Sequence, residues 1–268
     1  MGIKSPVKFT YMQINQRFSL HGKTAIVTGA SKGIGRAIAI ALAEHGANVV
    51  VSSRKKEAVD EVAAEIILSG LEAKAIACHV AHPDQLKSLL DDTIATYGGV
   101  DILVNNAAIN PVYGPLEDSN ETAFDKIMEV NVKAPFLLSK LVFPVMKERG
   151  GGSIINISSV EGIRPAFGLG LYSASKAALT MLTQNMGKEW GKYKIRANVI
   201  CPGLVKTKFS AALWEDEALM SEFNNNLPLG RAAEPEEMTG LAVFLASDAA
   251  SYATAGVYSL DGGYLVSG

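Results

Sequence analysis

Three glycines in the stretch TGASKGIG have the spacing of a phosphate-binding turn. Gly29, Gly33 and Gly35 lie between an apolar segment (23–29) and an amphipathic one (34–46), which the pattern predicts to be a strand and a helix. A glycine-rich turn between a strand and a helix directs backbone N–H groups and the positive end of the helix dipole at an anion. The spacing GxxxGxG by itself is equally compatible with a plain structural turn. Its position in the first strand–helix unit favours a phosphate site.

The residues after the second predicted strand indicate which nucleotide binds. In dinucleotide-binding folds an Asp or Glu about 20 residues after the glycines accepts a hydrogen bond from the ribose 2′-OH. Here Ser53 and Arg54 occupy that region, and the first acidic residue is Glu57. Since no carboxylate repels a 2′-phosphate, and Arg54 and Lys32 are available to bind it, the sequence predicts NADP(H), with NAD as the alternative. The same charged run is also typical of the solvated start of a helix.

Two serines, a tyrosine and a lysine form a second candidate group. Tyr172 and Lys176 are four residues apart and therefore share one face of a predicted helix. Ser158 and Ser159 end a predicted strand, which places them at the carboxyl edge of a parallel sheet, where ligands bind in open α/β folds. A tyrosine and a lysine at this spacing are common on solvated helices. Their combination with the serines and the glycine loop, in contrast, specifically indicates an active site.

Strand-like and helix-like segments alternate along the chain. This alternation predicts an α/β fold: a Rossmann-type, doubly wound parallel sheet of about seven strands, with helices on both faces, in a single domain. The predicted strands are 23–29, 48–53, 73–80, 100–107, 152–159, 195–200 and 257–263, and the predicted helices are 34–46, 55–69, 83–97, 121–148, 172–190 and 235–246. The domain is expected to cover residues 18–268, after a poorly ordered N-terminal arm of residues 1–17.

Composition excludes several classes of protein. The chain of 268 residues is 48% hydrophobic and 19% charged with a net charge of −2, which argues against a nucleic-acid-binding surface. No secretory signal and no apolar run long enough to cross a membrane is expected. Two distant cysteines, Cys78 and Cys201, predict neither a disulfide framework nor a zinc site and favour a cytoplasmic location. The four histidines lack metal-ligand spacing, so no metal is expected, and no GxSxG motif suggests a hydrolase.

The sequence resembles the short-chain dehydrogenase/reductase family over about residues 18–264. The motifs that carry the resemblance are TGASKGIG (28–35), NNAA (105–108), NV (131–132), SS (158–159), YSASK (172–176), PG (202–203) and DGG (261–263). Two positions depart from the family pattern. His79 stands where an Asp usually contacts adenine, and Cys201 replaces the usual residue before the PG turn. A small buried thiol is the expected role of Cys201.

The resemblance implies a role for each motif. Tyr172 would be the general acid/base, Ser159 would hold the substrate oxygen, and Lys176 would hold the nicotinamide ribose and lower the pKa of Tyr172. Asn131 would bind a water of a proton relay, and Thr207 would contact the carboxamide. The full set of implied cofactor-binding residues is Gly29, Ser31, Lys32, Gly33, Ile34, Gly35, Ser53, Arg54, Asn106, Tyr172, Lys176, Pro202, Gly203, Val205 and Thr207.

One ammonium group is sufficient in principle to activate the tyrosine. Free tyrosine has a pKa near 10, too high for a base at neutral pH. A unit charge about 4 Å away contributes roughly 4 kcal/mol at an effective dielectric constant near 20. That corresponds to a drop of about three pKa units before burial is counted. We therefore expect Lys176 to lower the pKa of Tyr172. Ser159 needs no activation, because it donates to negative charge that develops on a carbonyl oxygen.

These features together predict an NADP(H)-dependent oxidoreductase that interconverts a ketone or aldehyde and an alcohol by hydride transfer. A 3-oxoacyl-thioester (acyl carrier protein) reductase would share every catalytic residue and is the alternative among enzymes. A non-catalytic nucleotide sensor is the alternative outside them, although it would not need Asn131, Ser159, Tyr172 and Lys176. The expected partner is a small carbonyl or alcohol substrate, with no nucleic acid and no membrane.

Two expectations concern surfaces. The resemblance implies a homotetramer, and the apolar segment 131–146 is compatible with an interface helix and equally with core. The segment 204–226 is expected to form a lid over an apolar substrate, through Phe209, Leu213, Trp214, Met220 and Phe223.

Overall fold

The computed structural model describes residues 13–210, 214, 220, 224 and 227–267. Residues 1–12 of the predicted arm, and Leu213 and Phe223 of the predicted lid, lie outside the described residues. The last residues of the predicted arm form a short helix, α1 (Ile14–Arg17). Within the described part, no helix has both the length and the apolar character needed to cross a membrane.

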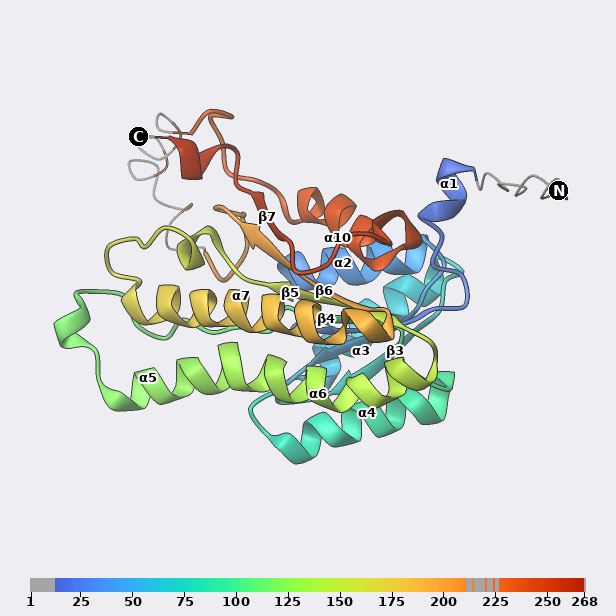
Figure 1. Ribbon diagram of the computed structural model, residues 1–268. Helices are drawn as coiled ribbons and strands as arrows, with labels where there is room; N and C mark the ends of the chain where they lie inside the picture. The colour runs from blue at the N-terminus through green and yellow to red at the C-terminus, as the bar shows by residue number, and fades with distance from the viewer. Residues whose placement is uncertain (1–12, 211–213, 215–219, 221–223, 225–226, 268) are drawn as a thin grey trace, which may run out of the picture.

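Seven parallel strands form one sheet in the order β3-β2-β1-β4-β5-β6-β7 (Figure 1). All seven predicted strands are present, in a single domain. The strand order reverses between β1 and β4, and ligands of open α/β sheets bind beyond the carboxyl ends of the strands at such a reversal. The strands are β1 (Thr24–Thr28), β2 (Asn48–Ser53), β3 (Ala73–Ala77), β4 (Ile102–Asn105), β5 (Gly152–Ile157), β6 (Ile195–Pro202) and β7 (Val257–Leu260).

Helices cover both faces of the sheet, with α2 and α10 on one face and α4, α6 and α7 on the other (Figure 1). The longer helices are α2 (Gly33–Glu44), α3 (Lys56–Leu68), α4 (Pro83–Tyr97), α5 (Glu121–Met128), α6 (Ala134–Glu148), α7 (Gly170–Trp190) and α10 (Thr239–Ala246). The short 3₁₀ turns are η1 (Leu116–Asp118), η3 (Val160–Gly162), η4 (Gly191–Tyr193), η5 (Pro235–Met238), η6 (Asp248–Ala250) and η7 (Tyr264–Val266).

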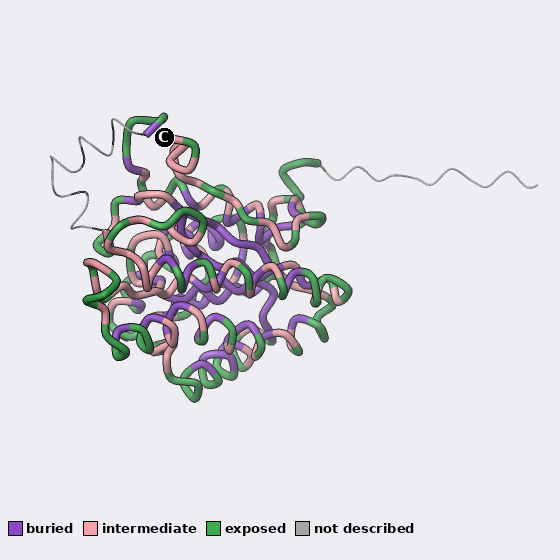
Figure 2. The backbone as a smooth tube through the Cα atoms, turned by 60° about the vertical axis from the view of Figure 1, so that its left-hand side comes forward, coloured by how far each residue is buried: buried purple, intermediate pink, exposed green. Residues whose placement is uncertain are grey.

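Alternate residues of each strand enter two separate hydrophobic clusters. In β1, Ala25 and Val27 pack with α2, α3 and α10, whereas Ile26 packs with α4, α6 and α7. This alternation follows from the period of two in a strand, and it explains why the strands read as continuous apolar runs. Figure 2 shows the result, with buried residues along the centre of the molecule and exposed residues on the outer sides of the helices.

The predicted helix 121–148 is interrupted. Between α5 and α6 the chain forms a π-helical segment, η2 (Glu129–Lys133). Pro135 has no N–H to donate to the carbonyl group of Asn131, four residues earlier, so a continuous α-helix is disfavoured here. Wide turns of this kind often occur at functional sites, and this one contains Asn131.

Candidate active site

The glycine loop joins β1 to α2 and is pressed against the segment that follows β4. Gly29 has a φ of +64°, and a Cβ atom there would lie 2.8 Å from the Cα atom of Ala107. A Cβ atom at Gly35 would lie 2.5 Å from the carbonyl oxygen of Gly29 and would collide with the side-chain amide of Asn106. The two glycines therefore permit a contact between backbones that no other residue type would allow.

Asn106 holds this loop in place. Its side-chain amide donates to the carbonyl oxygens of Thr28 (3.0 Å) and Gly29 (3.1 Å). The backbone N–H groups of Asn106 and Ala107 both donate to the Thr28 hydroxyl, at 3.1 and 3.2 Å. Both side-chain donors of Asn106 are thus used within the protein. Its side chain therefore helps to position the glycine loop.

The two predicted cations lie at the ends of neighbouring strands. Lys32 precedes the first residue of α2, is exposed and makes no side-chain capping hydrogen bond. Arg54 directly follows Ser53, the last residue of β2, and is also exposed. The backbone N–H of Ala30 donates to the Ser52 carbonyl (3.0 Å), which ties the glycine loop to β2.

His79 lies next to this basic group. The N–H of the preceding Cys78 donates to the Ser53 carbonyl (2.9 Å), so His79 extends from the strand beside Arg54. Burial, and then the charges of His82 and Arg54, lower the pKa of His79. The His79 and His82 rings are 4.6 Å apart. Where the family usually has an acid, this chain therefore has an imidazole next to a guanidinium.

The serines at the end of β5 have different functions. The Ser158 hydroxyl is buried and donates to the carbonyl oxygen of Lys176 (2.9 Å), which attaches the strand to α7. The Ser159 hydroxyl accepts a hydrogen bond from the N–H of Glu161 (3.1 Å). Hydrogen bonding to Ser159 also lowers the pKa of Tyr172, although burial has the larger effect. Ser159 is therefore the serine that faces the phenol.

Helix α7 places Lys176 beneath Tyr172. Lys176 is 2% exposed, its ammonium donates to the Ile157 carbonyl (2.8 Å), and it lies 5.5 Å from the centre of the Tyr172 ring. Burial lowers the pKa of Lys176 to about 8. Burial also raises the pKa of Tyr172 well above its usual value.

The net pKa of Tyr172 is thus raised and not lowered, because burial dominates. The loss of solvation disfavours the charged form of both groups.

Asn131, in the π-helical segment η2, connects three parts of the site. Its side-chain N–H groups donate to the Ile109 carbonyl (2.9 Å) and the Ser175 hydroxyl (3.1 Å), and its carbonyl accepts from the Ile109 N–H (2.9 Å). The Ser175 hydroxyl in turn donates to the Tyr172 carbonyl (2.7 Å). Both side-chain N–H groups are committed to this network, so a relay water would have to bind another group of Asn131.

The segment after β6 completes the site. Pro202 ends β6, and Gly203 donates its N–H to the Leu260 carbonyl (3.0 Å). Val205 forms an isolated bridge with Ala233. The methyl group of Thr207 would lie 3.1 Å from a Cβ atom at Gly33, which brings this segment against the glycine loop.

Phe209 of the predicted lid segment contacts Tyr172. The rings of Phe209 and Tyr172 are 6.0 Å apart. The indole N–H of Trp214 donates to the Thr207 carbonyl (2.8 Å), which holds the start of this segment. An apolar ring thus lies beside the phenol.

Glu161 is a residue of this site that the sequence reasoning missed. It lies two residues after Ser159, and its carboxylate charge raises the pKa of Tyr172. Its proximity to Ser159 in the sequence was the available signal, but one acid in a loop has no pattern that sets it apart.

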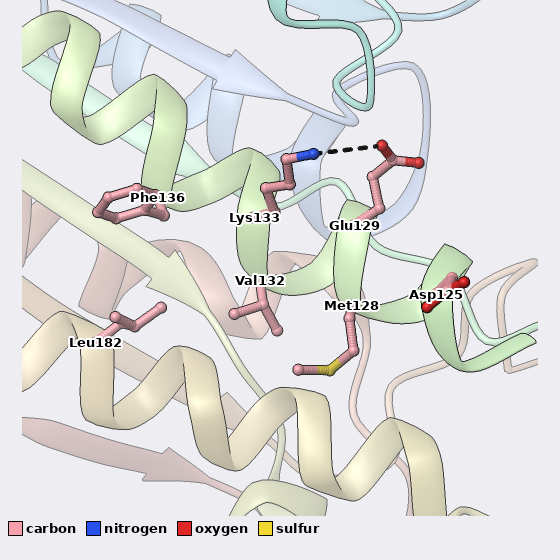
Figure 3. Close-up of a pocket in the computed structure, with 7 residues that line it drawn as sticks. All are labelled: Asp125, Met128, Glu129, Val132, Lys133, Phe136 and Leu182. Carbon is pink, nitrogen blue, oxygen red and sulfur yellow. Dashed lines mark ion pairs between the residues drawn. The ribbon is translucent and has the colours of Figure 1, made fainter. Parts of the chain in front are cut away.

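A separate hollow of about 580 Å³ lies between η2, the flanking helices α5 and α6, and α7 (Figure 3). The ion pair between Lys133 and Glu129 (3.8 Å) spans one side of it. It contains none of the predicted catalytic residues, so we place the reaction at the carboxyl edge of the sheet. The hollow is lined by Asp125, Met128, Glu129, Val132, Lys133, Phe136 and Leu182.

Comparison with known proteins is consistent with this arrangement. Residues 29–265 match a family described as enoyl-(acyl carrier protein) reductase. Dehydrogenase/reductase SDR family member 4 of Oryctolagus cuniculus is 44% identical over 250 residues, which cover 93% of this chain and 96% of that protein. The chain belongs to the short-chain dehydrogenase/reductase family. It is accordingly an oxidoreductase, as the sequence predicted.

Two solved structures share the fold. A gluconate 5-dehydrogenase from Burkholderia cenocepacia, in complex with NADP and tartrate, is 34% identical with a TM-score of 0.90, covering 94% of this chain and 98% of that one. A 7α-hydroxysteroid dehydrogenase complexed with NADH and 7-oxo glycochenodeoxycholic acid is 36% identical with a TM-score of 0.90, at the same coverage. Members of this fold thus bind either nicotinamide cofactor.

Proposed function

We propose that this protein is an NADP(H)-dependent oxidoreductase that interconverts a ketone or aldehyde and the corresponding alcohol. One observation carries the proposal: Ser159, Tyr172 and Lys176 lie together at the carboxyl edge of the sheet. The glycine loop, which follows β1, lies at the same edge. The two solved relatives bind NADP and NADH, which supports a nicotinamide cofactor.

The loops at this edge fit a dinucleotide. Side chains at Gly29 and Gly35 would collide with the protein itself, so the backbone surface of the loop stays open to a phosphate group. Lys32 and Arg54 would hold a 2′-phosphate, and neither makes a salt bridge among the described residues. We expect Thr207, which lies against the glycine loop, to contact the nicotinamide end. When bound, NADP(H) supplies or accepts the hydride.

The side chains handle the oxygen and the proton. Ser159 donates a hydrogen bond to the carbonyl oxygen, where negative charge develops as the hydride adds to the carbon. Tyr172 gives its proton to that oxygen and is left as a phenolate. Its raised pKa suits a proton donor in the reductive direction. Lys176 stabilises the phenolate, and Asn131 holds Ser175 and hence the first turn of α7 in position.

Consumption of NADPH by the purified protein, with a panel of ketones, aldehydes and acetoacetyl thioester, tests this function. We expect turnover with ketones or aldehydes, and we expect Tyr172→Phe to lower it by about 10²- to 10⁴-fold with little change in NADPH affinity. Tyr193→Phe is the matched control, because Tyr193 lies beyond the far end of α7. Turnover with the thioester alone would favour the 3-oxoacyl-thioester reductase. Tight NADPH binding without turnover would favour a sensor.

We further propose that the protein forms a homotetramer in the cytoplasm. Large apolar side chains are exposed on α5, α6 and α7, namely Phe124 (47%), Phe136 (39%) and Met181 (59%), and Phe136 lines the hollow in Figure 3. Such a surface is typical of a protein interface. Both cysteines are buried and unpaired, which suits a reducing compartment. Light scattering of the purified protein measures the mass of the assembly.

A further inference from the structure

Two histidines after β3 lie next to the proposed phosphate-binding arginine. The N–H of Cys78 donates to the carbonyl oxygen of Ser53 (2.9 Å). His79 and Arg54 directly follow these two residues, at the ends of neighbouring parallel strands. The ring of His82 lies 4.6 Å from the ring of His79. The two imidazoles and the guanidinium therefore lie at the carboxyl edge of the sheet, where the phosphates of a nucleotide bind in open α/β folds.

Hydrogen bonds hold His79 in this position. Its backbone N–H donates to the side-chain oxygen of Gln85 in α4 (2.7 Å), and its Nδ1 atom accepts from the N–H of Ala81 (3.3 Å). The proton of the neutral ring is then on Nε2, which is able to donate to a ligand. His79 is half-buried and His82 is exposed, so a ligand can reach the pair from solvent.

The groups that face His79 come from three neighbouring elements. Burial lowers the pKa of His79 most, followed by the charges of His82, before α4, and Arg54, after β2. Glu129 of η2 raises this pKa, but its carboxylate also pairs with Lys133 (3.8 Å). The pKa of His79 is lowered overall, because a positive charge on the ring would be partly desolvated and would lie beside the guanidinium.

A bound phosphate group reverses this balance. A phosphomonoester carries nearly two negative charges at neutral pH, with a second pKa near 6. It therefore attracts the proton that Arg54 repels. Because the rings of His79 and His82 are only 4.6 Å apart, they titrate as a pair, and one proton is bound more readily than two. The protonated ring then forms a charge-assisted hydrogen bond to the phosphate.

We propose that His79 and His82 complete the site for the 2′-phosphate of NADP(H), and that binding of this phosphate is coupled to the uptake of a proton by the two rings. The preference for NADP(H) over NAD(H) then increases as the pH falls. The inference rests on the proposed NADP(H)-dependent function and names a pH regulation of its cofactor site. His79 and His82 are specificity-determining residues for the cofactor and take no part in hydride transfer.

The sign of the pH dependence separates the histidines from the permanent cations. As the pH falls towards 6, the phosphate begins to lose its second negative charge. A site made only of Lys32 and Arg54 should therefore bind NADP⁺ more weakly at lower pH. Imidazoles gain a positive charge in the same range and have the opposite effect. Groups at the nicotinamide end affect NAD⁺ and NADP⁺ alike and cancel in the ratio of the two dissociation constants.

Isothermal titration calorimetry of the full chain with NADP⁺ and with NAD⁺, at pH 6.5, 7.5 and 8.5 and constant ionic strength, tests the proposal. We expect the Kd of NAD⁺ divided by the Kd of NADP⁺ to rise roughly 10-fold from pH 8.5 to pH 6.5, the low end for a charge-assisted hydrogen bond. Titrations in two buffers of different ionisation enthalpy should show more proton uptake with NADP⁺ than with NAD⁺.

Histidine variants assign the effect to the pair. The double variant His79→Gln/His82→Gln should abolish the rise in the ratio and leave the Kd of NAD⁺ nearly unchanged. His82→Gln alone should reduce the rise, and this exposed side chain makes no capping hydrogen bond to α4, so its loss leaves the fold intact. His21→Gln is the control, because His21 is exposed and precedes β1, which places it at the opposite edge of the sheet.

The outcomes separate the two proposals. If the wild type binds both cofactors equally at every pH, the NADP(H) assignment in the proposed function fails and the inference falls with it. If NADP⁺ is preferred but the ratio stays constant or declines as the pH falls, the function stands and the inference is overturned. The same holds if the histidine variants keep the full rise. Thermal denaturation verifies that the variants are folded.

Discussion

Burial of the Lys176 charge should cost stability, and replacing the lysine with methionine should reveal this cost. Lys176 is 2% exposed, and its ammonium makes one hydrogen bond, to the Ile157 carbonyl. Among the salt bridges of the described residues, none includes Lys176. Methionine has a similar length and no charge, so Lys176→Met removes the buried charge with little change in packing.

The size and the sign of the effect on the free energy of unfolding follow from the pKa of Lys176. Burial lowers this pKa from 10.5 to about 8. Below pH 8 both the folded and the unfolded chain carry the charge, and the folded state bears a penalty of roughly 3 kcal/mol at about 1.36 kcal/mol per pKa unit. Between pH 8 and 10.5 the unfolded chain binds more protons than the folded one, so the free energy of unfolding rises with pH. This gain is about 2.5 kcal/mol between pH 7 and pH 10.

Urea denaturation of both proteins at pH 7 and pH 10, at one protein concentration and without cofactor, measures the difference. The wild type should gain about 2.5 kcal/mol relative to Lys176→Met over this range. At pH 7 the two should be similar, because the variant loses the penalty but leaves the Ile157 carbonyl unpaired. Lys188→Met is the control, since it removes an exposed lysine from the same helix. A parallel pH dependence of wild type and Lys176→Met would refute the reasoning.

Three further predictions concern cofactor and substrate. Arg54→Ala should reduce the preference for NADP(H) over NAD(H) in kcat/KM more than Lys32→Ala does, because only a guanidinium forms a bidentate contact with phosphate. Equal use of both cofactors by the wild type, at low and high salt, would contradict the assignment of these two residues to the 2′-phosphate. Ser159→Ala should lower kcat more than it raises KM, since its hydrogen bond strengthens as the alkoxide develops, and a change in KM alone would limit Ser159 to docking. Gly35→Ala should weaken NADPH binding in a fluorescence titration, because its Cβ atom would lie 2.5 Å from the Gly29 carbonyl; unchanged affinity would show that the loop can shift.

The fold could be predicted from local patterns because strands and helices of this chain differ clearly in length and period. All seven strands were found from short apolar runs. The long helix 121–148 was predicted without its interruption, although Pro135 was visible in the sequence. A proline in the first turn of a helix is well tolerated, so its presence alone does not reveal whether the preceding turn widens.

The site was predictable where chemistry requires a motif, and unpredictable where it depends on the surroundings. Tyr172 and Lys176 share a helix face, and that spacing was sufficient to pair them. Their pKa values depend on how completely α7 and β5 exclude water, which no spacing in the sequence expresses. Asn106 could be assigned to the site by its motif, but its use as a brace for the glycine loop follows only from the positions of Thr28 and Gly29.

The electrostatics of this edge depend on three groups that are each incompletely compensated. Burial moves Lys176 and Tyr172 towards their neutral forms, and the carboxylate of Glu161 adds a charge that opposes the phenolate. In such a setting a single charge added nearby has a large effect, because little water is present to screen it.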